Sequence, residues 1–316
     1  MNRMSKIDLS EMAYVVYQVP DLDLMEKFLI DFGMSRAERT PEALYMRGDG
    51  PSHHVHVSRL GPEPAFLGIA FLVGSRDALE LAARIPDATA IKPITDPGGG
   101  ERVTLTTPGG HTIWLEYGAD QSPVNTVREA EKLNFVLDKR RFNTPVRQSR
   151  AIAKVLKIGH AVLRVTNGQP EVDWLMEHFN LVPSDYICAP GDPDPIVLGT
   201  FLRYDRGAEF VEHHCLLVNE SSLSGCHHSS FEVIDLDAIM TGNEHLRDRG
   251  WTLDAGVGRH YLGSLIYDYW LDPFGNRIEH YTDTDMVNKD HKPVHFDGPI
   301  ETTTQWGPAP PPTFFD

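Results

Sequence analysis

The sequence predicts an α+β fold built from two similar halves, and three observations lead to this prediction. An alternating, strand-like run followed by an amphipathic helical stretch occurs at residues 12–34 and again at residues 158–181. Later in each half a second strand precedes a second helix, in LGIAFLVGSRDALELAARI and in HSSFEVIDLDAIMTGNEHLRDRGW. Each half then closes on a turn and a strand, TPGGHTIWLEY and DPFGNRIEHY. Because the order of elements is the same, we interpret the chain as an internal duplication.

The first helix of each half is predicted from the spacing of its apolar residues. These recur at helical intervals and each stretch ends at a glycine- or asparagine-bearing stop. The residues concerned are Leu24, Phe28 and Phe32 in the first half, and Val172, Leu175 and Phe179 in the second.

The duplication sets the expected domain boundaries, at residues 1–118 and 155–283. Between them, residues 119–154 form a charged connector whose composition is compatible with a helix. The tail, residues 284–316, ends in GPAPPPTFFD, and proline there excludes a helix or a central strand because it lacks the N–H and fixes φ. Such a tail lies extended over the body or at a subunit interface, or it is disordered, and the sequence leaves these alternatives open.

The composition excludes several classes of function. A formal net charge of −16 repels nucleic-acid phosphates, so we expect no nucleic-acid partner. Apolar runs such as AFLGIAFLV are much shorter than the roughly 20 residues of a membrane span, and the first residues show no secretory signal. Three cysteines without a CxxC pair argue against a disulfide framework or a thiolate zinc site. We therefore expect a cytoplasmic protein without a membrane partner.

The histidines of the second half are the candidates for metal chemistry. His160 lies on its first strand, His228 on a middle strand and Glu279 on its last strand. Two imidazoles and one carboxylate suit non-haem Fe(II) or Mn(II) and leave positions open for substrate and O2.

Side-chain alternation helps to choose between paired histidines. In HHSSFEV, His227 shares a strand face with Phe231, which suits the core, so His228 on the opposite face is the expected ligand. In VEHHCLLV the same alternation separates His213 from His214 but does not decide between them.

The segment GRHYLGSLIYDYWLDPFGNRIE resembles the signature of type I extradiol ring-cleaving dioxygenases of the catechol 2,3-dioxygenase kind, within the vicinal oxygen chelate superfamily. In that pattern a histidine is followed nine residues later by a tyrosine, then by a turn and the ligand glutamate. Here these residues are His260, Tyr269 and Glu279. The segments IGHAVL around His160 and HHSSFEV around His228 are similar to the two histidine-ligand strands of the family.

The resemblance implies two tandem vicinal-oxygen-chelate domains, each a pair of βαβββ modules that form a cupped sheet. It implies an extradiol dioxygenase of aromatic compound catabolism, which cleaves a catechol-type ring beside the diol with O2 as co-substrate. The expected cofactor is Fe(II), with Mn(II) as an alternative, and no organic cofactor is expected. The substrate would be a small aromatic diol and the protein a homo-oligomer. The implied metal ligands are His160, His228 and Glu279.

Three further residues receive catalytic roles from the resemblance. VEHHCLLV is similar to the segment of the family's catalytic histidine, which falls on His214. His214 would take a proton from a substrate hydroxyl and later return it. Tyr269 and His260 would hydrogen-bond the substrate oxygen and orient it.

Two features depart from the family pattern. Asp268 precedes Tyr269 where the family has an apolar residue, and Leu262 and Gly263 replace a polar pair of some biphenyldiol-cleaving members. We expect these differences to affect the ring substituents and the hydrogen bonds around O2. The tail with Trp306 and its proline run is similar to that of trihydroxytoluene oxygenase and related enzymes, which favours a small or polysubstituted catechol.

The duplication also provides an internal comparison. Tyr14, Gly68 and Trp114 fall opposite the three candidate ligands, so we expect the first half to be metal-free. The run HHVHV, in which alternation places His54 and His56 on one strand face, aligns with EHHCLLV and is interpreted as structural histidines.

Other functions remain as alternatives. A 2-oxo-acid-dependent oxygenase similar to hydroxyphenylpyruvate dioxygenase would use the same ligand set, but the His-x8-Tyr spacing and the His213–His214 pair favour the catechol enzyme. A metal-free binding protein of the bleomycin-resistance type shares the modules but needs no ligand triad. A glyoxalase-like isomerase draws its ligands from two modules, and the first half offers none.

Overall fold

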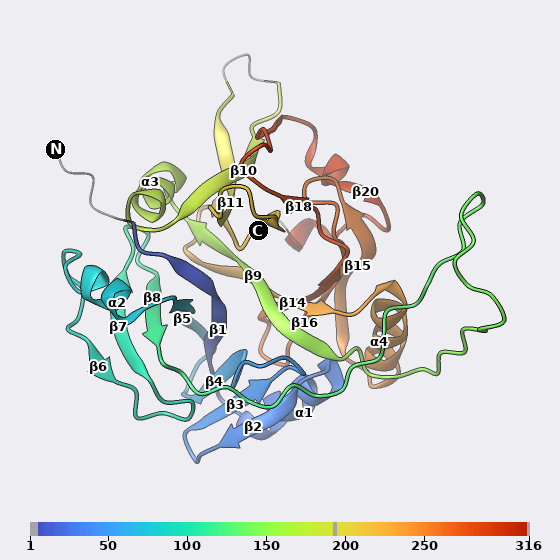
Figure 1. Ribbon diagram of the computed structural model, residues 1–316, viewed down its shortest axis with the longest axis horizontal. Coiled ribbons are helices and arrows are strands. Elements are labelled where there is room, and N and C mark those ends of the chain that lie inside the picture. Colours follow the sequence, from blue (N-terminus) through green and yellow to red (C-terminus); the bar gives the residue numbers. More distant parts are fainter. Residues whose placement is uncertain (1–5, 192–194, 315–316) are drawn as a thin grey trace.

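The computed structural model describes residues 6–191 and 195–314 (Figure 1). In these residues two large sheets, of eight and ten strands, account for most of the regular structure, together with four α-helices. The predicted α+β class is confirmed. No helix in the described part of the chain is both long and apolar enough to cross a membrane.

The first half forms the eight-stranded sheet. Its strands follow the spatial order β2-β3-β4-β1-β5-β8-β7-β6. The elements are β1 (Leu9–Val19), α1 (Leu22–Phe32), β2 (Ser35–Arg39), β3 (Ala43–Arg47), β4 (His56–Leu60), β5 (Ala65–Val73), α2 (Arg76–Ala82), β6 (Lys92–Pro93), β7 (Glu101–Thr106) and β8 (Thr112–Tyr117).

The second half forms the ten-stranded sheet, in the order β19-β10-β11-β13-β9-β14-β17-β16-β15-β20. Its elements are β9 (Val155–Val165), α3 (Gly168–His178), β10 (Leu181–Cys188), β11 (Val197–Tyr204), β13 (Leu216–Glu220), β14 (Gly225–Val233), α4 (Leu236–Asp248), β15 (Thr252–His260), β16 (Ile266–Leu271) and β17 (Arg277–Thr282). The tail adds β19 (His295–Phe296), β20 (Thr304–Trp306) and the short 3-10 helices Ile300–Thr303 and Pro312–Phe314, while β12 (Val211–Glu212) pairs with β18 (Met286–Val287).

The two sheets share one topology. β1 pairs in parallel with β4 and antiparallel with β5, and β9 pairs in the same way with β13 and β14. The next neighbour is parallel in both sheets, β8 beside β5 and β17 beside β14. Corresponding positions of the two halves can therefore be compared through their pairing register.

Helix α1 shows how local sequence sets the elements. The Asp21 side chain caps its first turn by accepting from the backbone N–H groups of Asp23 and Leu24. The helix ends at Gly33, whose φ of 119° is a left-handed conformation that favours glycine. A Cβ at Gly33 would also lie 1.8 Å from the backbone oxygen of Ala153, so the chain entering the second half passes directly against this glycine.

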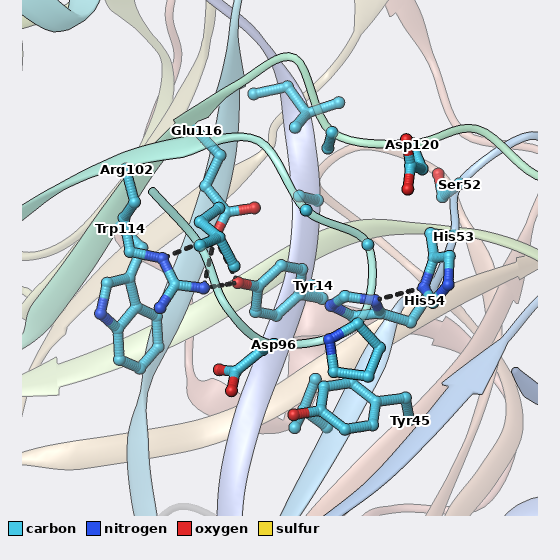
Figure 2. Close-up of a pocket in the computed structure, with 18 of the residues that line it drawn as sticks. Tyr14, Tyr45, Ser52, His53, His54, Asp96, Arg102, Trp114, Glu116 and Asp120 are labelled. Atoms are coloured by element: carbon cyan, nitrogen blue, oxygen red, sulfur yellow. Dashed lines mark hydrogen bonds and ion pairs between the residues drawn. The ribbon is translucent and has the colours of Figure 1, made fainter. Parts of the chain in front are cut away.

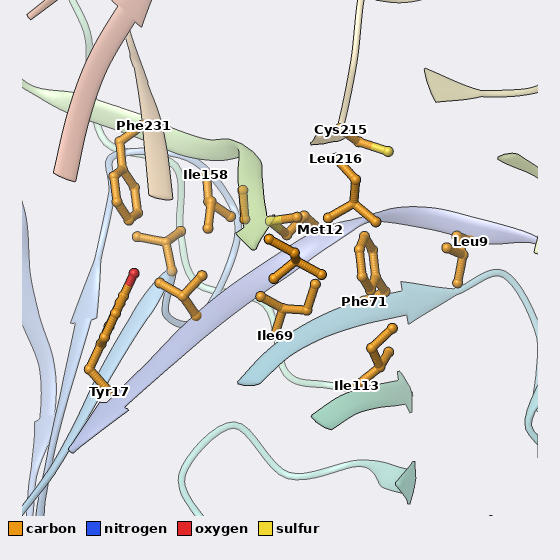
Figure 3. Packing of buried hydrophobic residues seen from close by; sticks show 14 of the residues in the cluster. Leu9, Met12, Tyr17, Ile69, Phe71, Ile113, Ile158, Cys215, Leu216 and Phe231 are labelled. Atoms are coloured by element: carbon orange, nitrogen blue, oxygen red, sulfur yellow. The ribbon is translucent and has the colours of Figure 1, made fainter. Parts of the chain in front are cut away.

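The two halves bury one common core. Val15 and Tyr17 of β1 pack in the same cluster as Ala161 and Leu163 of β9, with α1 and the facing sides of both sheets (Figure 3). Because side chains alternate along a strand, the intervening residues of β1 and β9 point to the opposite face of each sheet. That opposite face carries Tyr14 in the first half and His160 in the second.

Buried polar contacts join the halves as well. His280 is fully buried, stacks on Phe32 at 3.7 Å between ring centroids and approaches the Phe32 carbonyl oxygen at 2.6 Å. Its other ring nitrogen lies 3.0 Å from Asp268, which also accepts from Asn243. Asp268, expected to affect the substrate, therefore belongs to the packing between the halves, since alternation turns it away from the face of Tyr269.

The connector is the clearest departure from the sequence-based expectation. Residues 119–154 contain no helix and extend along and beyond the body (Figure 1). The apolar residues Leu133, Phe135, Val136 and Leu137 are all exposed, so the helical spacing of Leu133, Val136 and Leu137 provides no face that packs on the body. A short helix without a packed apolar face is marginal in water, which explains the difference. Arg128 anchors the connector through two bonds of 2.6 Å to Asp235.

Phe32→Ala tests the shared core. The substitution removes a fully buried ring that contacts both His280 and Phe231, so we expect the free energy of unfolding to fall by about 3–5 kcal/mol. The measurement is urea unfolding monitored by circular dichroism. Ile30→Ala on the exposed side of the same helix is the control and should change it by less than about 1 kcal/mol. Equal effects of the two substitutions would contradict a core shared between the halves.

Candidate metal centre

His160, His228 and Glu279 meet on three neighbouring strands. Ser230 of β14 pairs in register with His160 of β9 on one side and with Glu279 of β17 on the other. These positions therefore form a row across the sheet, on the face opposite the common core. His228 lies two residues before Ser230 on β14 and pairs with Val162, and the register is irregular only on its other side, between Cys226 and His228.

The three side chains bring their ligand atoms together. Glu279 Oε2 lies 3.1 Å from His160 Nε2 and 3.5 Å from His228 Nε2. All three residues are buried, with exposed fractions of 2%, 6% and 0% for His160, His228 and Glu279. The two imidazole rings are nearly perpendicular at 79°, with centroids 5.7 Å apart. This is the spacing at which one metal ion can be bound by two imidazoles and a carboxylate.

A bound cation would also give the second carboxylate oxygen of Glu279 a partner. Its Oε1 atom is buried without a hydrogen-bond partner, while Ser230 donates to Oε2. Burial alone would raise the pKa of Glu279, but the neighbouring imidazoles of His160, His260 and His228 lower it well below its usual value. Burial lowers the pKa of His228 well below its usual value, so this ring is neutral. A carboxylate and neutral imidazoles are the protonation states that a metal requires.

His214 lies beside this group rather than within it. Its ring centroid is 4.2 Å from that of His160, and the side chain is 5% exposed. The alternation that the sequence suggested for VEHHCLLV does not apply, because residues 213–215 interrupt the strand between β12 and β13. Burial lowers the pKa of His214 well below its usual value, and the rings of His160 and His213 lower it further.

Asp185 and His213 form a chain of contacts behind His214. Asp185 Oδ2 is 2.8 Å from His213 Nε2, and His213 Nδ1 is 3.0 Å from His214 Nδ1. Burial alone would raise the pKa of Asp185, but the hydrogen bonds from His213 and from the backbone of Val294 lower it. Asp185 gave no signal in the sequence, because it lies 28 positions upstream of His213 and reaches it only through the pairing of β10 with β11 and of β11 with β13.

Asp185, His213 and His291 also lie within the distance range of a metal site. Hydrogen bonds already use the nitrogens concerned. His291 Nε2 lies 3.0 Å from the Ser184 carbonyl oxygen, to which it can only donate. We therefore interpret this group as a hydrogen-bond network.

Tyr269 and His260 are paired at the edge of the metal group. Tyr269 Oη lies 2.8 Å from His260 Nε2, and the Tyr269 ring contacts His228 at 5.0 Å between centroids. His260 Nε2 is 3.7 Å from Glu279 Oε1. Burial raises the pKa of Tyr269 well above its usual value, and the charge of Glu279 raises it further. Tyr269 is therefore a neutral hydrogen-bond donor.

The position expected for His227 is wrong. The sequence placed it on the core face, but the irregularity at Cys226–His228 directs its ring toward the tail. His227 Nε2 lies 2.6 Å from the carbonyl oxygen of Phe314, and the ring of Phe314 contacts Tyr269 at 4.8 Å. Phe314 is buried, so the end of the tail folds over this side of the site, one of the alternatives that the sequence left open.

In the first half, other residues occupy the corresponding register positions. Ala70 of β5 pairs with both Tyr14 and Trp114, as Ser230 pairs with both His160 and Glu279. Gly68 pairs with Val16, as His228 pairs with Val162.

The expectation that His54 and His56 share a strand face is wrong. β4 begins only at His56. His54 packs on Tyr14, while His56 stacks on Tyr17 in the common core. The two rings therefore point to opposite faces of the sheet.

Comparisons with known proteins agree with this geometry. Residues 157–280 match the family model described as Glyoxalase/Bleomycin resistance protein/Dioxygenase superfamily. The chain is 27% identical over 307 residues to metapyrocatechase 2 of Cupriavidus necator, covering 94% of this chain and 88% of that protein.

Two solved structures extend the likeness to the whole fold. An extradiol ring-cleaving dioxygenase from B. fuscum is 18% identical with a TM-score of 0.79, over 98% of this chain and 82% of that one. The Mn(II)-bound glyoxalase from Novosphingobium aromaticivorans is 23% identical with a TM-score of 0.78, over 98% and 94%. The resemblance inferred from the sequence motifs, and the fold that it implied, are confirmed.

Metal binding by the purified protein tests whether His160, His228 and Glu279 form a metal site. We expect the wild-type chain, incubated anaerobically with Fe(II) and desalted, to retain a single iron, because the Glu279 carboxylate and the imidazoles of His160 and His228 are arranged to bind it. Glu279→Gln should lose most of the iron, since a neutral amide cannot replace the carboxylate. The measurement is inductively coupled plasma mass spectrometry. Glu116→Gln, a matched change on the corresponding strand of the first half, should retain the iron, and its loss there would contradict the assignment.

Proposed function

We propose that the chain is an extradiol dioxygenase, because residues 157–280 match the model of the glyoxalase/bleomycin resistance protein/dioxygenase superfamily. It would cleave a catechol-type aromatic ring beside the diol, with O2 as co-substrate. The observation that carries the proposal is the buried His160–His228–Glu279 group with a neutral histidine, His214, beside it. The similarity to metapyrocatechase 2 across nearly the whole chain supports the same chemistry.

His160, His228 and Glu279 would hold the metal. Fe(II) bound there supplies two open positions for the diol oxygens, a third for O2, and a path for electrons from the ring to O2. The same donor set accepts Mn(II), and one solved relative of this fold carries Mn(II). We propose Fe(II) as the working metal.

The hydrogen-bond chain behind His214 favours its role as a base. His213 donates from Nε2 to the Asp185 carboxylate, which accepts only, so His213 Nδ1 carries no proton when the ring is neutral. That nitrogen must then accept from Nδ1–H of His214. His214 is left with an unprotonated Nε2, the nitrogen that can take a proton from a substrate hydroxyl and return it later.

Tyr269 and His260 are suited to orient the diol. Tyr269 stays protonated, and its pairing with His260 fixes the direction of its hydroxyl. In this role the two residues hydrogen-bond a substrate oxygen close to Glu279. The ring of Phe314 packs on Tyr269 and limits the space on this side of the candidate metal centre. This supports a substrate with a single ring.

A homo-oligomer is proposed as well. The connector exposes the apolar side chains Phe135, Val136, Leu137 and Phe142, with exposed fractions between 51% and 98%. Contiguous exposed apolar residues of this kind are typical of interaction surfaces. Location in the cytoplasm stays a prediction of the sequence.

A catechol panel tests the activity. The Fe(II)-loaded wild type should give the yellow ring-fission product in air without any 2-oxo acid. His160→Ala should abolish it because a ligand is lost, whereas His54→Ala in the first half should retain it. The measurement is the absorbance of product over time.

The alternatives predict other outcomes of the same assay. Turnover that requires a 2-oxo acid would contradict the proposal in favour of the oxo-acid oxygenase. Iron bound without any turnover of a catechol would likewise favour the oxo-acid oxygenase, and the absence of bound iron would favour a binding protein.

Asp185→Asn tests the hydrogen-bond chain. An amide in place of the carboxylate no longer fixes the proton on His213 Nε2, so kcat should fall about 10-fold or more with little change in KM or iron content. The measurement is steady-state kinetics with the best catechol of the panel. Asp138→Asn, an exposed position in the connector, should behave as wild type. A wild-type kcat for Asp185→Asn would show that His214 does not depend on this chain.

A further inference from the structure

The first half contains a pocket of its own, on the face that corresponds to the metal centre (Figure 2). Tyr14 and Trp114 stand at the register positions of His160 and Glu279 and line this pocket. The His53–His54 pair keeps the geometry of His213–His214, with 3.0 Å between the two Nδ1 atoms in both cases. Aromatic rings have thus replaced the ligand atoms while the surrounding framework is retained.

One carboxylate of the pocket, that of Glu116, has hydrogen-bond partners at only one of its two oxygens. Glu116 Oε1 accepts from the Tyr14 hydroxyl at 2.5 Å and from Arg102 Nε at 2.7 Å. Glu116 as a whole is 3% exposed, but its Oε2 atom takes part in neither bond and is not fully buried, so it opens into the pocket. A carboxylate oxygen that reaches the pocket without a protein donor is suited to accept a hydrogen bond from a ligand.

The opposite side of the pocket is aromatic. His54 packs on Tyr14 at 4.3 Å and on Tyr45 at 5.2 Å between centroids. Burial lowers the pKa of His54 to about 3, so this ring is neutral. Figure 2 shows Tyr14 between the Arg102–Glu116 pair on one side and the two histidines on the other. Tyr14, Tyr45 and Val57 form one apolar cluster, against which Trp114 packs.

The charges of the pocket select a neutral ligand. Glu116 is paired with Arg102, and Asp96 is paired with Arg59 at 2.6 Å. An anion would approach both carboxylates and a cation would approach both arginines, while the two other acidic residues of the lining, Glu11 and Asp120, are exposed. The enclosed volume is about 70 Å³, less than the ~150 Å³ of a cavity that holds benzene, so a single aromatic ring would fill the pocket and extend beyond its mouth.

We propose that this pocket is a second, non-catalytic binding site for a small neutral phenol, whose hydroxyl donates to Glu116 and whose ring packs in the aromatic cluster. The chemistry of recognition is that of an uncharged aromatic ring with a hydroxyl donor. The inference does not rest on the proposed function, since none of the three candidate metal ligands lies in this pocket.

Fluorine NMR of the whole protein labelled with 5-fluorotryptophan tests the proposal. The chain has five tryptophans, and Trp114→Phe identifies the resonance of the one that lines the pocket. Titration with phenol should shift the Trp114 resonance saturably in the wild type. His228→Ala, which removes a candidate metal ligand, should give the same shift. A Trp114 resonance that stays unmoved by phenol would overturn the proposal.

Two pocket variants and a matched control test where phenol contacts the protein. Glu116→Gln should weaken phenol binding about 10-fold, because a charged acceptor is lost. Ala13→Val keeps every polar group but adds two methyl groups to the cavity, and should also weaken binding. Glu101→Gln, an exposed neighbour on β7, should bind as wild type. Wild-type affinity in both pocket variants would overturn the proposal.

Charged aromatic molecules test whether the pocket prefers a neutral ligand. Benzoate and benzylammonium, each carrying one ring and one charge, should shift the Trp114 resonance far less than phenol at equal concentration. A stronger response to either ion would overturn the assignment of a neutral ligand. Failure of phenol binding would leave the catechol assay of the second half unaffected, so the two proposals are tested separately.

Discussion

Side-chain alternation on three neighbouring strands fixes the position of the candidate metal centre. β9, β14 and β17 each send one set of residues into the core shared by both halves and the other set to the opposite face. Ala161, Phe231 and Ile278 pack in the core, and this fixes the direction of their strand neighbours His160, Ser230 and Glu279. The hydrophobic effect thereby determines where the polar group lies. A slip of one residue would bury the ligands in the core.

The duplication shows how far such a framework can diverge. Both sheets retain the same strand order and the same paired histidines, yet one face carries ligand atoms and the other carries aromatic rings and an ion pair. Asp185 marks a second difference. It holds His213 in the second half, whereas Glu38, which pairs opposite Tyr45 as Asp185 pairs opposite Phe201, is exposed. The fold therefore conserves the frame, and function follows from a few side chains on one face.

Much of this could be predicted from the sequence. Helical and strand periodicity revealed the duplication, and the motif around Glu279 located the residues that the fold brings together. The alternation rule failed where the chain leaves regular strand geometry, at the interruption after Glu212, before β4 at His54, and at the irregularity between Cys226 and His228. Asp185 and Phe314 carried no local signal, because their neighbours come from distant segments. The prediction of a helix in the connector failed for another reason, because a helix-compatible composition does not by itself provide an apolar face that packs on the body.

A crystal structure of the Fe(II)-loaded protein, with anomalous difference maps on both sides of the iron absorption edge, would locate the metal. We expect one strong peak within coordination distance of His160 Nε2, His228 Nε2 and a Glu279 carboxylate oxygen, with His214 uncoordinated beside it. A peak at Asp185, His213 and His291 instead, or at the histidines of the first half, would contradict this expectation.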